Sequence, residues 1–348
     1  MPIDIEELDR YVDLHRLEDW MDDRGLGRGL IQDGEILAGG TQNILLRFTR
    51  DGRAYVLRRP PHNPYMNGSE TIRREIRVLE ALAATDVPHA RLIAPCGDEE
   101  VLGAAFYLME PVDGFSPVRG LPLLHQARPA IRHAMGLSLV DALVALHRVD
   151  PAQVGLSDFG KPRNHLARQI ARLVKQLDSY ASYDGWTGRA EISGVEKVAA
   201  WLETNMPAEA APGIVHGDFH MGNAMFAKTG PEVRAIVDWE LATTGDSACD
   251  LGCLLATWAE ADGTHPGCIE VTPWDGFPME EELVRHYCAG IGRDVDANWY
   301  AVFGCFRLAI LLEGTYARAQ AGKADMETGA WLHRTAINLL NRASRRSS

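Results

Sequence analysis

Short apolar segments bounded by turn residues occur in the first third of the chain, which is the pattern of β-strands. Segments 44–48 and 54–59 are two such segments, and Asp51-Gly52 between them is a favourable hairpin turn. A further apolar segment at 104–110 has the same strand character. The pattern therefore predicts a small antiparallel sheet in this part of the chain.

Helical spacing of apolar residues becomes the dominant pattern beyond residue 68. Ile72, Ile76 and Leu79 lie four and three positions apart, which predicts an amphipathic helix over 69–84 with Ser69 as its N-cap. Most of the later chain has apolar spacing of the same kind. The other predicted helices cover 122–148, 161–181, 194–205, 303–321 and 329–342.

The order of these elements predicts an α/β (α+β) chain with two main parts. A small sheet part covers 1–110, and its first thirty residues are expected to form a helical prelude packed on the sheet. A large helical part covers 111–342, and the basic segment 343–348 is expected to be a disordered tail. With 348 residues, of which 46% are hydrophobic, the chain can bury a substantial core.

Composition and charge exclude several classes of partner. A formal net charge of −13 argues against nucleic acid. No apolar run approaches the length of a membrane span, and the acidic N-terminus lacks a secretory apolar region, so we expect no membrane contact and a cytoplasmic location. Six cysteines in a chain of this length indicate buried free thiols and no disulfide framework.

The segment 216–223, which reads His-Gly-Asp-Phe-His-Met-Gly-Asn, carries the strongest chemical signal. An Asp followed five positions later by an Asn, with a second Asp beyond a short hairpin, is the layout of a kinase catalytic centre. Asp218 would orient and deprotonate an attacking hydroxyl, while Asn223 and Asp238 would hold Mg²⁺ on the phosphates of ATP. Turn residues at 228–231 predict the hairpin that brings Asn223 beside Asp238.

Two other interpretations of this segment stay open when it is considered alone. His216, Asp218 and His220 alternate, so on a strand they would share one face and could ligate the transition metal of a metal-dependent hydrolase. The segment could also be an acidic loop with a structural histidine. Residues of the N-terminal part favour the kinase interpretation over both.

Candidate nucleotide contacts occur in the predicted sheet. Val56 and Arg58 share one face of their strand, which fits an aliphatic contact to adenine beside a cation on the phosphates. Glu75, in the following helix, can reach back to Arg58 and form the ion pair that holds this cation in place. A turn with paired glycines, which let the backbone approach phosphates closely, precedes these residues. Its candidate contacts are Gly39, Gly40, Thr41 and Asn43.

Together these motifs resemble the aminoglycoside phosphotransferase/choline kinase family of small-molecule kinases, which has a bilobal, protein-kinase-like fold. The resemblance covers most of the chain, from Glu35 to Arg318. Gly-Gly-Thr-Gln-Asn at 39–43 and Asp-Trp-Glu-Leu-Ala-Thr-Thr-Gly at 238–245 look most like one branch of the family. In that branch, stand-alone bacterial proteins resemble the kinase domain fused to acyl-CoA dehydrogenases in animals.

The resemblance implies further roles for individual residues. Backbone groups of Glu110 and Val112 would bond adenine at the hinge between the lobes. His216 would brace the catalytic loop and not take a proton, and Asp250 would brace the loop backbone from behind. Arg58 stands where most kinases have Lys, which replaces a point charge by a planar fork.

The resemblance also implies an enzyme that uses ATP and Mg²⁺ to phosphorylate a hydroxyl of a small molecule. The loop at 259–279 is long enough to be functional, and it is expected to line the acceptor site with Trp274 as a contact. Its aromatic residues favour an endogenous metabolite such as a hydroxyacyl-CoA over an aminoglycoside antibiotic, whose ammonium groups would need several carboxylates. A non-catalytic, nucleotide-binding pseudokinase is the remaining alternative.

Overall fold

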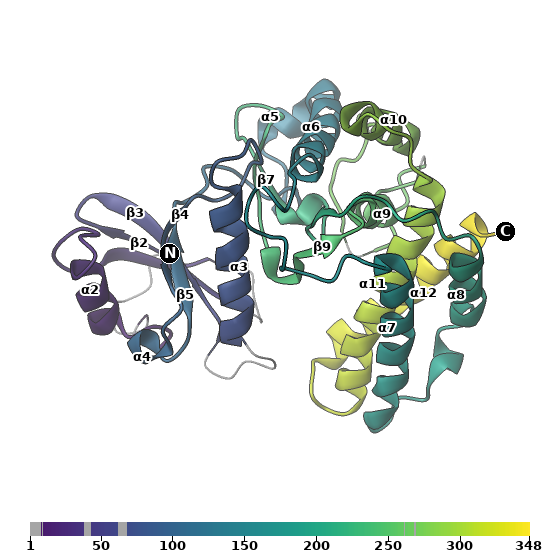
Figure 1. Cartoon of the computed structure of the whole chain (residues 1–348), viewed down its shortest axis with the longest axis horizontal. Helices are drawn as coiled ribbons and strands as arrows, with labels where there is room; N and C mark the ends of the chain where they lie inside the picture. Colours follow the sequence, from purple (N-terminus) through teal and green to yellow (C-terminus); the bar gives the residue numbers. More distant parts are fainter. Residues whose placement is uncertain (1–7, 9, 38–42, 62–67, 261, 268) are drawn as a thin grey trace. The chain divides into compact units, whose positions relative to one another are not determined.

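The computed structural model describes residues 8, 10–37, 43–61, 68–260, 262–267 and 269–348. The chain forms two compact units, Met1–Asp113 and Gly114–Ser348 (Figure 1). The first unit is built on a β-sheet, and the second consists mainly of helices. The boundary between the units lies close to the boundary predicted after residue 110.

The first unit contains a five-stranded antiparallel sheet with the strand order β1-β2-β3-β5-β4. Strands β2 and β3 form the predicted hairpin, and both of its turn residues, Asp51 and Gly52, have positive φ angles of 52° and 73°. The predicted strands are therefore confirmed. The elements of this unit are α2 (Leu14–Asp22), β1 (Gln32–Ile36), β2 (Ile44–Arg50), β3 (Arg53–Arg59), α3 (Gly68–Leu82), β4 (Leu92–Cys96), α4 (Glu99–Leu102) and β5 (Phe106–Met109).

Two helices cover the two faces of this sheet (Figure 1). Helix α2 buries Leu17 and Trp20 against sheet residues such as Phe106, which confirms the predicted helical prelude for the part of the chain that the structure describes. Helix α3 lies on the opposite face. Its predicted N-cap is wrong, because α3 already begins at Gly68 and the Ser69 hydroxyl accepts a hydrogen bond from the Ala105 N–H at 3.2 Å.

The second unit packs most of its helices around one core. This core joins α7, α8, α9, α11 and α12 through apolar side chains such as Leu173, Val198, Phe303 and Leu339. Helices α9 and α11 approach closely at Gly252 and Gly304, where a Cβ on either glycine would collide with the backbone of the other helix. The α-helices of this unit are α5 (Leu123–Ala127), α6 (Pro129–His147), α7 (His165–Ser179), α8 (Val195–Thr204), α9 (Ala248–Thr257), α10 (Glu280–Ile291), α11 (Ala297–Gln320) and α12 (Met326–Arg346).

Short strands and 3₁₀ turns complete the second unit and flank the segment 216–223. Strand β6 pairs with β9, and β7 pairs with β8, both antiparallel. These elements are β6 (Gly213–Val215), β7 (Ala224–Phe226), β8 (Val233–Ile236) and β9 (Thr243–Gly245), with 3₁₀ turns η1 (Pro117–Arg119), η2 (Tyr180–Ser182), η3 (Arg189–Glu191), η4 (Met221–Asn223) and η5 (Trp239–Leu241).

The prediction of a disordered tail over 343–348 is wrong. Helix α12 continues to Arg346, and Ala343 is completely buried in the core. The basic side chains that suggested a solvated tail instead form ion pairs, Arg345 with Glu260 and Arg346 with Glu280. Charge composition could not reveal these pairs, because their acidic partners lie far away in the sequence.

Helix α6 also differs from expectation, because it is long and apolar enough to meet the criteria for a membrane span. Half of the relevant window is buried inside the fold, and core helices of water-soluble proteins satisfy the same criteria. The helix contains a buried Arg132 whose guanidinium donates to the backbone and carboxylate oxygens of Asp275 at 2.6 and 2.7 Å. The sequence-based expectation that no apolar segment is long enough to span a membrane is therefore wrong for residues 129–147.

Candidate active site

The loop that follows β6 is held by a carboxylate behind it. Asp250, in the first turn of α9, is buried and accepts hydrogen bonds from the backbone N–H groups of His216 at 2.6 Å and Gly217 at 2.8 Å. Gly217 has a φ of 87°, and a Cβ at this position would collide with the backbone oxygen of Leu241. This conformation therefore requires glycine, and the loop has the bracing contact expected for Asp250.

His147, the last residue of α6, adds a second layer to this support. Its Nε2 lies 3.3 Å from Asp250 Oδ2, and its Nδ1 lies 2.7 Å from the hydroxyl of Tyr287. Both His147 and Asp250 are buried. The imidazole thus links helices α6 and α10 to the carboxylate that holds the loop.

His216 has the contacts of a bracing residue. Its side chain is completely buried, its Nε2 lies 3.0 Å from the Val237 carbonyl, and its Nδ1 accepts the Asp218 N–H at 3.2 Å. This pattern requires the neutral tautomer with the proton on Nε2. Burial lowers the pKa of His216 and favours that neutral form. Trp239 packs edge-on against the ring, with the centroids 4.7 Å apart.

These contacts weigh against the metal-dependent hydrolase. His216 uses both ring nitrogens within the protein, so neither is available to a metal ion. The segment also leaves the strand conformation after Val215, so alternation no longer places His216, Asp218 and His220 on a common face. Among the residues that the structure describes, these three do not form a metal-binding cluster.

Asp218 lies at the centre of the loop with its carboxylate partly exposed. Its Oδ2 accepts a hydrogen bond from Asn223 Nδ2 at 3.1 Å and lies 3.4 Å from His220 Nε2. Burial opposes ionisation of Asp218, but the nearby His220 and the positive charge of Arg307 outweigh it and hold the pKa of the carboxyl below its usual range. The side chain is therefore an ionised hydrogen-bond acceptor that can orient a hydroxyl group.

Asn223 and Asp238 come together through the β7–β8 hairpin. Ala224 pairs with Ile236, and the Val237 N–H donates to the Asn223 carbonyl at 2.9 Å, so the residues that flank the hairpin are neighbours. Asp238 itself has a φ of 70°, which is unusual for a residue with a side chain. This backbone conformation sets the direction of the Asp238 side chain at the point where the chain leaves the hairpin.

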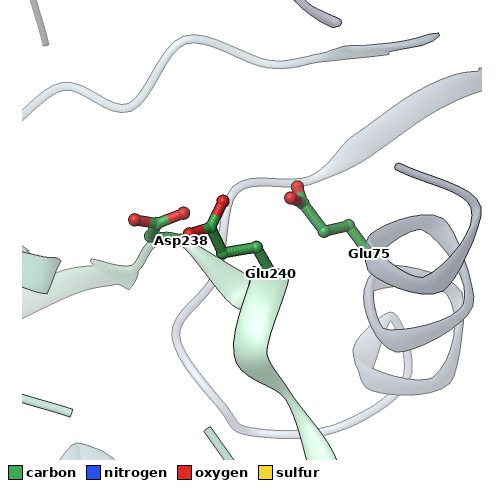
Figure 2. Close-up of side chains that lie close together, drawn as sticks. All are labelled: Glu75, Asp238 and Glu240. Carbon is green, nitrogen blue, oxygen red and sulfur yellow. The ribbon is translucent and has the colours of Figure 1, made fainter. Parts of the chain in front are cut away.

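The oxygen atoms of this region suit a magnesium ion. The amide nitrogen of Asn223 donates to the backbone and side-chain oxygens of Asp218, which orients the amide and leaves its Oδ1 as the atom for a cation. Asp238 and Glu240 belong to the same short segment, and a carboxylate oxygen of Asp238 lies within 4.8 Å of a carboxylate oxygen of Glu240 (Figure 2). Oxygen-only ligands of this kind are those that Mg²⁺ prefers.

The first unit holds the ion pair expected from the sequence. Arg58 Nε lies 2.8 Å from Glu75 Oε2, and Arg58 Nη2 donates to Glu75 Oε1 at 2.9 Å, which is a two-point contact. The Tyr107 hydroxyl donates to Glu75 Oε2 at 2.8 Å. Figure 2 shows the Glu75 carboxylate at the end of its side chain on α3. Glu75 is completely buried, and Tyr107 is a partner that the sequence did not indicate.

The other predicted nucleotide contacts are only partly described. Gly39, Gly40 and Thr41 lie outside the described residues, whereas Asn43 is half-buried immediately before β2. Val56 is buried on the central strand β3. One of the backbone groups expected to bind adenine is already occupied, because the Glu110 N–H donates to the Arg91 carbonyl at 2.9 Å. Glu110 can therefore offer adenine only its carbonyl oxygen, and Val112 follows it as a half-buried residue.

The loop between α9 and α10 has an aromatic cluster as its core. Trp274 stacks on Phe277 with the ring centroids 4.5 Å apart, and it meets Trp258 edge-on at 4.8 Å. His265 packs against the same indole at 4.7 Å. Trp274 is therefore engaged in packing within the loop, and its predicted contact with the acceptor stays a prediction.

The fold and these residues define a kinase-like phosphotransferase, with a sheet unit that contains an arginine–glutamate pair and a helical unit that contains the catalytic segment. The chain belongs to the phosphotransferase enzyme family, whose model matches residues 33–277.

Known proteins that resemble the chain agree with this family. A crystal structure of a Ralstonia eutropha protein, provisionally named an aminoglycoside phosphotransferase, is 32% identical, has a TM-score of 0.77, and is matched over 96% of this chain and 99% of that chain. A mutant of aminoglycoside phosphotransferase APH(4)-Ia in a ternary complex with AMP-PNP and hygromycin B is 15% identical, with a TM-score of 0.60, and is matched over 93% of this chain and 97% of that chain. The second likeness shows the fold alone.

Curated relatives include acyl-CoA dehydrogenase family member 10 of Mus musculus, at 32% identity over 79% of this chain, and family member 11 of Gallus gallus, at 30% identity over 84%. The chain spans only 25% and 37% of the lengths of these two relatives.

Proposed function

We propose that this protein is a small-molecule kinase that transfers the γ-phosphoryl group of ATP to a hydroxyl group. The observation that carries the proposal is the arrangement of Asp218, Asn223 and Asp238, in which the amide of Asn223 holds the catalytic carboxylate and keeps an oxygen for a cation. Phosphoryl transfer depends mostly on positioning and on neutralisation of charge, and this arrangement supplies both.

Each residue has a distinct task in this mechanism. Asp218, ionised and oriented by Asn223, accepts the hydrogen bond of the acceptor hydroxyl and directs its oxygen toward the phosphorus. Asn223 Oδ1 and Asp238 would hold Mg²⁺, with Glu240 as the adjacent carboxylate. The bound ion would neutralise charge on the phosphates. In the first unit, Arg58 would contact phosphate oxygens, and Glu75 with Tyr107 fixes its guanidinium.

For the acceptor we propose an endogenous hydroxylated metabolite such as a hydroxyacyl-CoA. Support comes from the names of the relatives, which are acyl-CoA dehydrogenase family members. This chain matches only a minor part of each of them. A kinase that phosphorylates aminoglycosides is the second candidate, and the provisional name of the Ralstonia eutropha protein favours it. The net charge of −13 would suit a polycationic antibiotic, although overall charge does not describe the acceptor site.

The test is an ATP-consumption assay on the purified chain with Mg²⁺. Acceptors are hydroxyacyl-CoA thioesters, free hydroxy acids and aminoglycosides of the kanamycin type, and the phosphorylated product is identified by mass spectrometry. Asp218→Asn serves as the inactive control. Phosphorylation of a hydroxyacyl compound that Asp218→Asn abolishes supports the proposal. Efficient phosphorylation of the antibiotics alone would transfer the assignment to the second candidate, and nucleotide binding without turnover of any acceptor would indicate a pseudokinase.

A further inference from the structure

His220 caps the short turn that leads to Asn223. It is the N-cap residue of the 3₁₀ turn η4, and its Nδ1 accepts the Gly222 N–H at 3.1 Å. A ring nitrogen that accepts a backbone N–H carries no proton, so the imidazole is the neutral tautomer with its proton on Nε2. The turn therefore decides which nitrogen of His220 can donate a hydrogen bond.

Gly222 also leaves room for the imidazole ring. A Cβ at this position would lie 3.0 Å from Cε1 and 3.1 Å from Nδ1 of His220. These distances are shorter than ordinary van der Waals contacts, so a larger residue at position 222 would displace the ring. The His220 side chain is itself only 12% exposed. The turn and its surroundings thus hold the imidazole in one orientation.

The opposite side of the ring faces the catalytic carboxylate. Nε2 of His220 lies 3.4 Å from Oδ2 of Asp218, and Asn223 Nδ2 donates to the same oxygen at 3.1 Å. The other oxygen of Asp218, Oδ1, is approached by the Cys253 thiol at 4.0 Å, and a thiol is a weak donor. Two N–H groups therefore converge on Oδ2, which leaves Oδ1 better able to receive the hydrogen bond of a substrate hydroxyl.

We propose that His220 is a positioning residue for phosphoryl transfer: its Nε2–H holds Oδ2 of Asp218, so that Oδ1 is presented to the acceptor hydroxyl. The separation of 3.4 Å is long for an N–H···O hydrogen bond, and contacts of this kind commonly shorten when a substrate binds. His220 neither takes the proton nor contacts the nucleotide in this role. The inference rests on the proposed kinase function and adds the residue that orients its catalytic carboxylate.

Two substitutions separate the roles of the two ring nitrogens. The Asn side chain reaches about as far as Nδ1, so His220→Asn keeps an acceptor for the Gly222 N–H and removes the donor to Asp218. The Gln side chain reaches about as far as Nε2, so His220→Gln keeps a donor to Asp218 and removes the cap. His286→Asn and His286→Gln are matched controls, because His286 pairs with Asp141 at 2.6 Å on the protein surface.

Turnover and thermal unfolding should respond in opposite ways in the two variants. His220→Asn should lower kcat roughly 10- to 100-fold, with KM for ATP changed less than about threefold and Tm close to that of the wild type. His220→Gln should keep kcat within about fivefold and lower Tm by roughly 2–4 °C, the effect of a lost cap. Wild-type kcat in His220→Asn, equal losses of kcat in both variants, or a loss that appears in KM for ATP would overturn the proposal.

A spectroscopic measurement distinguishes failure of this inference from failure of the kinase assignment. Protein labelled with ¹⁵N-histidine is examined by NMR correlation of the ring nitrogens and ring protons without nucleotide, and the His220 signals are assigned from their loss in His220→Gln. The Nε2–H tautomer, with an Nε2 signal that shifts in Asp218→Ala, supports the positioning contact even if no acceptor is phosphorylated. The Nδ1–H tautomer, or an Nε2 signal that Asp218→Ala leaves unchanged, refutes it.

Discussion

Asp250→Asn should damage both the stability of the second unit and the catalytic rate. In the native loop, Asp250 Oδ2 accepts the His216 N–H at 2.6 Å and Oδ1 accepts the Gly217 N–H at 2.8 Å. Asn is nearly the same size, but one of its two terminal atoms is an NH₂ group, which cannot accept. One buried N–H therefore loses its acceptor, and the other loses the benefit of a charged partner.

The expected magnitude follows from these two bonds. A buried donor without an acceptor costs about 1–3 kcal/mol, and loss of charge assistance adds about 1 kcal/mol, which together give about 2–4 kcal/mol. For a unit of this size, each kcal/mol lowers Tm by about 2–4 °C, so a decrease of roughly 5–15 °C is expected. A displacement of the loop by about 1 Å would lower kcat on the order of 100-fold.

Differential scanning calorimetry and the ATP-consumption assay measure the two effects, and Asp246→Asn is the matched control. Asp246 is also buried and accepts hydrogen bonds from the Ala248 N–H at 3.1 Å and the Tyr300 hydroxyl at 2.7 Å, but it does not touch the loop. This variant should lose comparable stability and keep nearly normal kcat while folded. Wild-type Tm and kcat in Asp250→Asn, or equal loss of kcat in both variants, would refute the reasoning.

Three further predictions address the catalytic residues and the pH dependence. Asp218→Asn should lower kcat by roughly 10²–10⁴-fold while Mg-ATP affinity by calorimetry stays nearly unchanged, and wild-type turnover would end its assignment. Asp238→Ala should weaken nucleotide binding only when Mg²⁺ is present; if Glu240→Ala has this effect and Asp238→Ala does not, Glu240 is the main ligand. Burial lowers the pKa of His165 below its ordinary value of 6.5, so the fold loses stability as pH falls below about 6.5, where the unfolded chain binds the proton more readily. Urea unfolding of His165→Gln between pH 7.5 and 5.5 should show a weaker decline than wild type, and an unchanged slope would contradict this origin.

Several features of the site could be predicted from the sequence because they depend on short distances along the chain. The β7–β8 hairpin that joins Asn223 to Asp238 follows from turn residues between two strand-forming segments. The pairing of Arg58 with Glu75 follows from a strand whose next element in the chain is an amphipathic helix that packs on the same sheet. Where charge alone guided the prediction, as in the supposed tail at 343–348, the result was wrong.

The amino-acid sequence by itself determined the elements, the catalytic motif and the family, because periodicity, turn chemistry and motif spacing are properties of neighbouring residues. Tertiary structure alone decided which distant side chains meet. His147 contacts Asp250 across 103 positions of sequence, and Tyr107 reaches Glu75 across 32. Such partners are selected by the packing of whole helices, and no local pattern of residues encodes that packing.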